Sequence, residues 1–249
     1  MKTGTDSRTT PIFEQIDKTV ADIHGWSPLD QLHSLFNLVF LTAGTPGDVV
    51  EIGSWSGRSA SVLGLAANMV GNTRVHCIDL FPAREDWSQN PDGSYSFQVT
   101  LGDRVYKGYH EQTAWKEPFE RDIATFYERH PSLLDAFNEV ITRHGLDQVV
   151  RPYRGDSASF VAASQGSVRC RLAFIDGDHS YQAVSRDIRN VETLLVAGGW
   201  ICFDDAFSHY EGVNRAIEEW IIGSGRYDPC QQMTRKFFVA RRLPAGGTN

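Results

Sequence analysis

The apolar and polar positions of the chain follow two alternating patterns, one typical of strands and one typical of helices. Short apolar runs that end in glycine or aspartate predict strands at residues 48–57, 74–81, 149–157, 171–180, 200–207 and 236–242. Apolar residues at helical spacing predict one or two helices over 11–43 and further helices over 59–70, 133–144, 181–195 and 213–222. Strands that alternate with helices predict an α/β fold, with a doubly wound, mostly parallel sheet and helices on both faces.

Residues 82–131 interrupt this alternation directly after the second predicted strand. The segment is polar but carries many aromatic side chains, among them Trp87, Tyr95, Phe97, Tyr106, Tyr109, Trp115, Phe119, Phe126 and Tyr127. It is too aromatic for a disordered linker and too long for an ordinary connection. We interpret residues 1–249 as one domain, with an N-terminal helical segment at 1–44 and an insertion at 82–131. The insertion is either a lid over a binding site or an oligomer contact, which leaves a homo-oligomer open.

Charge and cysteine content narrow the classes of partner. The 24 Lys and Arg against 31 Asp and Glu give a formal net charge of −7, which favours neither nucleic acid nor an anionic membrane as a partner and leaves a small-molecule acceptor. Cys77, Cys170, Cys202 and Cys230 are scattered, which predicts reduced thiols and a cytoplasmic protein. The first ten residues are polar, resemble no secretory signal, and are expected to be frayed.

A glycine-containing turn at residues 51–57 (EIGSWSG) follows the first predicted strand and precedes a helix. Glycines let the backbone approach a ligand, and free amides at a helix N-terminus suit a nucleotide or a carboxylate. Gly53 and Gly57 are four positions apart with Trp55 between them, which is not the GxGxxG spacing of NAD-binding folds. Asp79, at the end of the second strand, can accept hydrogen bonds from ribose hydroxyls, although it can also cap the next helix. A plain structural turn is the alternative for the glycine turn.

Acidic residues gather at the ends of the fourth and fifth predicted strands, which we expect to be neighbours in the middle of the sheet. These residues are Asp176, Asp178, Asp204 and Asp205, with His179 beside them. Carboxylates that converge repel one another unless a cation is present, and oxygen ligands suit Mg²⁺, or Mn²⁺ and Ca²⁺. Any one of them can instead cap the following helix, but capping does not explain the whole group.

The sequence EIGSWSGRS resembles the first motif of class I S-adenosylmethionine-dependent methyltransferases, in the variant seen in catechol and caffeoyl-CoA O-methyltransferases. The segments IDGDHSYQAVSRDI and GGWICFDD are similar to bacterial enzymes near the macrolide and aminocoumarin sugar O-methyltransferases and the cephalosporin hydroxylase group. The resemblance covers most of the chain outside residues 82–131. It implies a Rossmann-like methyltransferase fold with S-adenosyl-L-methionine as the cofactor.

The resemblance also implies roles for individual residues. For the cofactor these are Gly53, Ser54 and Gly57 at the methionine part, Glu51 at the loop or the methionine ammonium, Asp79 at the ribose, and Asp156 or Ser157 at the adenine. Asp176 is assigned both to the cofactor and, with Asp204 and Asp205, to a divalent metal. His179 lies where the resembling enzymes place a general base, and its imidazole suits that role near neutral pH. Asp178 is the rival base, and an exposed loop histidine is the other interpretation of His179.

The expected activity is divalent-metal-assisted O-methylation of a hydroxylated small molecule, such as a sugar or a glycosylated natural product. Two alternatives remain at this point. One is a metal-independent N- or C-methyltransferase, in which the acidic residues only cap helices. The other is a protein of the same fold that binds S-adenosylmethionine or a nucleotide without transferring a group.

Overall fold

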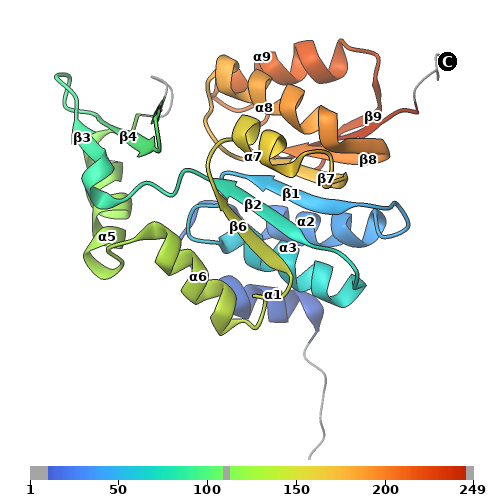
Figure 1. The fold of residues 1–249 in the computed structure, drawn as a ribbon, viewed down its shortest axis with the longest axis horizontal. Coiled ribbons are helices and arrows are strands. Elements are labelled where there is room, and N and C mark those ends of the chain that lie inside the picture. The colour runs from blue at the N-terminus through green and yellow to red at the C-terminus, as the bar shows by residue number, and fades with distance from the viewer. Residues whose placement is uncertain (1–10, 109–112, 245–249) are drawn as a thin grey trace, which may run out of the picture.

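A central seven-stranded sheet organises the computed structural model, which describes residues 11–108 and 113–244 (Figure 1). The strand order is β6-β2-β1-β7-β8-β10-β9. The first five strands in this order run parallel, and β10 runs antiparallel to both of its neighbours, β8 and β9. The strands are β1 (Asp48–Ile52), β2 (Val75–Asp79), β6 (Val150–Arg154), β7 (Cys170–Ile175), β8 (Leu195–Phe203), β9 (Tyr227–Gln232) and β10 (Phe238–Arg242). The predicted doubly wound, mostly parallel sheet is confirmed.

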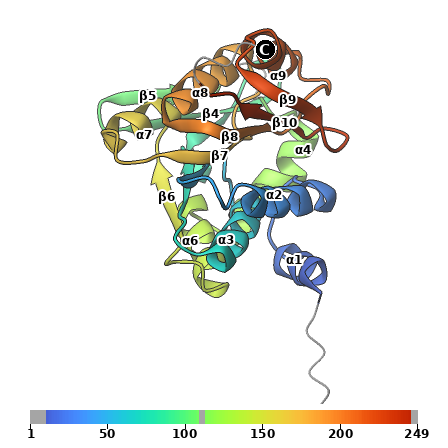
Figure 2. The ribbon, with the colours of Figure 1, turned by 90° about the vertical axis from the view of Figure 1, so that its right-hand side faces the viewer.

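Helices cover both faces of this sheet, as the two views in Figures 1 and 2 show. On one face lie α1 (Ile12–Val20), α2 (Leu29–Leu41), α3 (Arg58–Val70) and α6 (Leu133–Arg143), whose buried residues share one apolar cluster. On the other lie α7 (Ser157–Ser164), α8 (Tyr181–Leu194) and α9 (Glu211–Ile217), the last continued by η4 (Glu218–Ile222). Within the described residues, no helix is both long and apolar enough to cross a membrane.

The middle strands bring the ends of distant sequence segments together. All six residues of β7 are buried, because this strand pairs with β1 on one side and β8 on the other under helices on both faces. The pairing continues past the strand ends, where the amide of Asp176 donates to the carbonyl of Ile52 and the amide of Asp204 to that of Ile175. The residues that follow β1, β7 and β8 therefore meet at one edge of the sheet, where parallel α/β folds bind ligands.

The insertion forms a small unit of its own beside the main sheet (Figure 1). Its elements are η1 (Arg84–Asp86), β3 (Trp87–Gln89), β4 (Tyr95–Leu101), β5 (Arg104–Lys107), α4 (Lys116–Pro118), η3 (Phe119–Ala124) and α5 (Thr125–Arg129). The strands form a three-stranded antiparallel sheet in the order β3-β4-β5. Tyr95 and Phe119 stack with ring centroids 3.8 Å apart, and the Tyr127 hydroxyl donates to the Pro82 carbonyl, which ties the unit to the end of β2. Residues 109–112, with Tyr109, and the first ten residues lie outside the described part.

Outside the insertion, two elements went unpredicted, and the start of one strand was misplaced. The helix α7 follows β6, and Asp156 and Ser159 cap its first turn through reciprocal side-chain bonds to backbone amides. The edge strand β9 pairs with β10, but its sequence YDPCQQ is polar and holds a proline, so it lacks a strand pattern. The strand β8 begins at Leu195 rather than at residue 200, because its two glycines lie inside the strand instead of ending the preceding helix.

Candidate functional site

A cavity of about 1180 Å³ lies at the carboxyl edge of the parallel strands. It exceeds the roughly 300–1,000 Å³ usual for one small ligand, so it has room for a cofactor and an acceptor together. Its walls come from the loops after β1, β2, β6, β7 and β8, from the segment between α1 and α2, and from the insertion. The sequence predicted the strand-end loops as the site, and the cavity brings them together.

Gly53 is the point at which the loops after β1 and β7 touch. Its φ is +87°, and a Cβ placed on it would lie 2.0 Å from the carbonyl oxygen of Asp176. Only glycine permits this approach. Gly57 has a φ of +93° and precedes α3, where a Cβ would lie 3.1 Å from the Phe137 ring. Gly53 and Ser54 line the cavity, whereas Gly57 is a packing position outside its lining.

Three amides of the glycine turn donate to acceptors inside the protein. Those of Gly53 and Gly57 donate to backbone carbonyls, and that of Trp55 donates to Asp79 Oδ2 at 2.9 Å. The Phe81 amide donates to Asp79 Oδ1 at 2.6 Å. Burial raises the pKa of Asp79, and the amide bonds oppose that rise. Asp79 faces the cavity, and each carboxylate oxygen can accept a further hydrogen bond, so its role at the ribose stays a prediction.

Glu51 lies beneath the turn and is fully buried. Burial raises its pKa, and the nearby side chains of Ser54 and Ser59 oppose the rise. Glu51 does not line the cavity. This position favours its role in fixing the loop over direct contact with the methionine ammonium.

The loop after β6 presents Gly155, Asp156 and Ser157 to the cavity. Asp156 is the N-cap of α7 and accepts from the Ser159 amide at 2.9 Å. The Ser157 hydroxyl donates to Asp187 Oδ1 at 2.5 Å. Asp187 is on α8, also lines the cavity, and was not among the predicted site residues. Its position in the middle of a helix made it look like an ordinary surface charge in the sequence.

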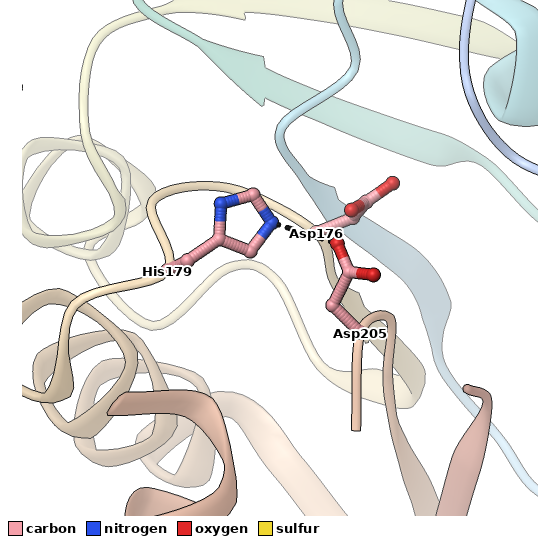
Figure 3. A group of neighbouring side chains, drawn as sticks. All are labelled: Asp176, His179 and Asp205. Carbon is pink, nitrogen blue, oxygen red and sulfur yellow. Dashed lines mark ion pairs between the residues drawn. The ribbon is translucent and has the colours of Figure 1, made fainter. Parts of the chain in front are cut away.

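Asp176, His179 and Asp205 form a compact group that can hold a metal ion, with one ligand atom from each lying within 4.8 Å of the others. Figure 3 shows the His179 ring directed at the two carboxylates, with His179 Nε2 3.0 Å from Asp205 Oδ2. Burial raises the pKa of Asp176 well above its ordinary value, and the nearby charges of Asp204 and Asp205 raise it further. The predicted convergence of these strand ends is therefore observed.

Asp204 lies beside this group but has a different partner. Lys236, which precedes β10, has its Nζ 3.1 Å from Asp204 Oδ2 and 3.2 Å from Asp205 Oδ1. Burial lowers the pKa of Lys236, but the facing carboxylates raise it more, so its pKa lies above the ordinary value. Burial would raise the pKa of Asp205, yet the bond to His179 and the charge of Lys236 hold it below the ordinary value. The assignment of Asp204 to the metal stays a prediction.

Lys236 is a site residue that the sequence analysis missed. It was read only as the first residue of the closing strand, because nothing in the sequence predicted that β10 would pair with β8 beside the acidic loops. The cluster of carboxylates was itself a sign that a positive charge lies nearby, either a metal ion or a lysine or arginine side chain.

The two candidate bases have different surroundings. Asp178 Oδ1 accepts from the Ser180 amide at 2.8 Å, and Ser180, not Asp178, caps α8 by accepting from the Ala183 amide. His179 is stacked on Tyr210, with ring centroids 4.0 Å apart and an interplanar angle of 14°. Both residues line the cavity. The stacking holds the imidazole in place beside Asp205, which an exposed loop histidine would not require.

The segment between α1 and α2 also lines the cavity, which the sequence analysis did not predict. Its His24 accepts at Nδ1 from the indole of Trp55 at 3.1 Å. Arg58, the first residue of α3, donates to the carbonyls of Ile23 at 2.9 Å and Ser27 at 3.1 Å. The glycine turn is thereby tied to the N-terminal segment. Trp26, from the same segment, is 52% exposed at the cavity.

Solved structures with this fold include several O-methyltransferases. The O-methyltransferase NovP matches with a TM-score of 0.64 and 17% identity, over 90% of this chain and 84% of that chain. The calicheamicin methyltransferase CalS11 matches at 0.56 and 15%, over 99% of both chains. An O-methyltransferase from Bacillus cereus in complex with S-adenosylhomocysteine matches at 0.57 and 15%, over 96% and 94%. At these identities the likeness shows the fold.

No curated protein sequence matches the chain. One family model matches a stretch of the chain that contains the glycine turn, Asp79 and the acidic loops, which all line the cavity. A family described as a methyltransferase domain matches residues 50–206, more than half of the chain, and the chain therefore belongs to that family.

Proposed function

We propose that the protein is an S-adenosylmethionine-dependent O-methyltransferase that uses a divalent cation and acts on a hydroxylated small molecule. The observation that carries this proposal is the position of Asp176. Its carbonyl oxygen abuts Gly53 of the glycine turn, and its carboxylate joins His179 and Asp205 in one group. A cofactor on the glycine turn and an acceptor hydroxyl at the acidic group would then be neighbours in one cavity.

The cavity suits an adenosyl cofactor in both shape and chemistry. Gly53 lines the cavity with backbone alone, and a side chain there would collide with the backbone of Asp176 and Gly177. Asp79 offers a carboxylate on the β2 side and Ser157 a hydroxyl on the β6 side, in the order that ribose and adenine require. The bound cofactor supplies an electrophilic methyl group, and the chain's residues hold it and bring an acceptor oxygen into line with it.

The donor set also fits a divalent cation. Asp176 and Asp205 are oxygen ligands of the kind that Mg²⁺ and Mn²⁺ prefer, while an imidazole favours softer metals. We therefore assign the carboxylates to the cation and keep His179 for proton transfer. A bound cation lowers the pKa of an acceptor hydroxyl. His179, held by Tyr210 and adjacent to Asp205, then takes the hydroxyl proton at a ring nitrogen.

The acceptor that this cavity favours is a sugar or a glycosylated natural product. Aromatic residues from the insertion and the N-terminal segment line its outer part, including Trp26, Phe97, Tyr106 and Trp115. Flat apolar faces of this kind suit sugar rings and planar ring systems, and they support the lid interpretation of the insertion. CalS11 is described as a TDP-rhamnose 3′-O-methyltransferase, and TomG as an O-methyltransferase involved in tomaymycin synthesis.

A metal-independent methyltransferase is the second candidate, and Lys236 favours it. The charge of this lysine already offsets part of the negative charge of Asp204 and Asp205, so the acidic group does not depend on a metal ion alone. Methyl transfer to a panel of hydroxylated sugars and glycosides, measured with and without EDTA, separates the two. The proposal expects transfer that EDTA abolishes and Mg²⁺ or Mn²⁺ restores. Transfer that survives EDTA would establish the second candidate.

Variants of the two candidate bases complete this test. Loss of general-base assistance costs about 10²- to 10⁴-fold in rate, so we expect His179→Ala to lower kcat by that order and to leave cofactor affinity nearly intact. Asp178→Asn is the matched comparison at the adjacent position. A near-normal kcat for His179→Ala together with a large loss for Asp178→Asn would move the base to Asp178.

A further inference from the structure

Asp187 is a buried carboxylate at the cavity to which neither the sequence analysis nor the proposed mechanism assigns a role. Its exposed fraction is 4%, and it reaches the cavity from the middle of α8. Among residues 11–108 and 113–244, no lysine or arginine forms an ion pair with it. Burying a carboxylate without such a pair is costly, so its presence calls for a reason.

One of its two oxygens is committed to the protein. Asp187 Oδ1 accepts from the Ser157 hydroxyl at 2.5 Å, and that hydroxyl oxygen itself accepts from Asn190 Nδ2 at 2.8 Å. The Ser157 proton is thus directed at Asp187, and Asn190 completes the chain. These bonds fix the orientation of the Asp187 carboxylate and join α8 to the first residue of α7.

The second oxygen lies toward Gly177 and the cavity. A Cβ placed on Gly177 would lie 3.9 Å from Asp187 Oδ2, and glycine at this position leaves the approach from the cavity open. Burial raises the pKa of Asp187 to about 6, so the carboxylate prevails at pH 7.5. Such an oxygen accepts hydrogen bonds and repels a carbonyl.

The position of Asp187 in the sheet order identifies the part of the ligand that it meets. Asp79 ends β2, and β6, next to it at the edge of the sheet, leads into Gly155, Asp156 and Ser157. A ribose at Asp79 therefore directs its base toward Ser157 and Asp187. The base of the proposed cofactor is adenine, which presents an exocyclic amino group with two N–H donors.

We propose that Asp187 Oδ2 accepts a hydrogen bond from the amino group of adenine and thereby selects an adenosyl cofactor. This inference rests on the proposed function, because it requires the adenosyl ligand. Asp156 is the competing acceptor in the same loop, but its carboxylate already caps α7. Asp187 is oriented by Ser157 and has its other oxygen directed toward the cavity side.

Titration calorimetry at pH 7.5 tests the inference with two probes, S-adenosylhomocysteine and S-inosylhomocysteine. The second carries a carbonyl in place of the amino group. We expect the wild-type protein to bind the adenosyl probe at least about tenfold more tightly, since a hydrogen bond to a charged group is lost and a repulsion is added. In Asp187→Asn the amide can donate to the inosyl carbonyl, so the preference should shrink or reverse.

Asp156→Asn tests the competing acceptor and should keep the wild-type preference. A folded Asp187→Asn protein with the wild-type preference would overturn the inference, as would loss of the preference in Asp156→Asn. If Asp187→Asn does not fold, the inference would still be overturned by a wild-type protein that binds both probes equally or by loss of the preference in Asp156→Asn. A wild-type protein that binds neither probe would instead refute the proposed function itself.

Discussion

Replacing Lys236 by methionine isolates the electrostatics of the acidic group. The change removes two ion pairs, at 3.1 Å to Asp204 and 3.2 Å to Asp205, and preserves most of the apolar stem. Removing one partner of a buried pair costs about 3–5 kcal/mol, because the remaining charge is left uncompensated. The Lys236 side chain is 18% exposed and that of Asp205 15%, so we expect the lower end of this range, about 3 kcal/mol.

Thermal unfolding measures this loss. For a chain of this size, about 3 kcal/mol corresponds to a fall in Tm of roughly 6–12 °C in EDTA. Arg235→Met, an equal loss of charge at the adjacent exposed position, is the control and should change Tm little. Millimolar Mn²⁺ should raise the Tm of Lys236→Met more than that of the wild-type protein, because a cation then supplies the missing charge. A fall no larger than that of Arg235→Met, or no added effect of Mn²⁺, would refute this account of the group.

Three further outcomes follow from the structure. Gly53→Ala should lower Tm far more than Gly71→Ala. Both positions have a positive φ, but only at Gly53 would a Cβ meet backbone, 2.0 Å from the Asp176 carbonyl oxygen. Equal falls in Tm would show that backbone strain alone matters. Burial raises the pKa of Asp187 from 3.8 to about 6. The contribution of Asp187 to the free energy of unfolding is therefore greatest below pH 4, and it declines by up to about 3 kcal/mol as the pH rises through 6. Denaturant titrations at several pH values should show a smaller decline in the free energy of unfolding for Asp187→Asn than for the wild-type protein. The same pH profile in both proteins would contradict the raised pKa of Asp187. Arg58→Lys should speed hydrogen exchange at residues 20–28, since a lysine cannot hold several carbonyls at once; unchanged exchange would mean that packing alone holds this segment.

The alternation of apolar runs and helical repeats was enough to predict six of the seven strands of the central sheet, all but β9. The strand β7 is buried on both faces, so its residues are apolar apart from Arg171, and the aspartates and the glycine that follow it stand out. The same logic predicted that Asp176 and Asp205 would meet, because neighbouring parallel strands end at one edge.

The parts that escaped prediction depend on contacts between distant segments. Lys236 reaches the acidic loops only because β10 turns back antiparallel to β8, and no local pattern encodes that pairing. The contact of His24 with Trp55 joins residues 31 positions apart. Asp187 is one of many polar residues on an amphipathic helix, and its contact with Ser157 of α7 is not encoded locally.

A crystal structure of the protein with S-adenosylhomocysteine and Mn²⁺ tests the central claim most directly. The account predicts an anomalous Mn²⁺ peak bound by carboxylate oxygens of Asp176 and Asp205, with the homocysteine sulfur beside it and the cofactor over Gly53. A cofactor at the glycine turn with no Mn²⁺ peak at millimolar concentration would contradict the metal-assisted mechanism and leave Lys236 as the cation of this site.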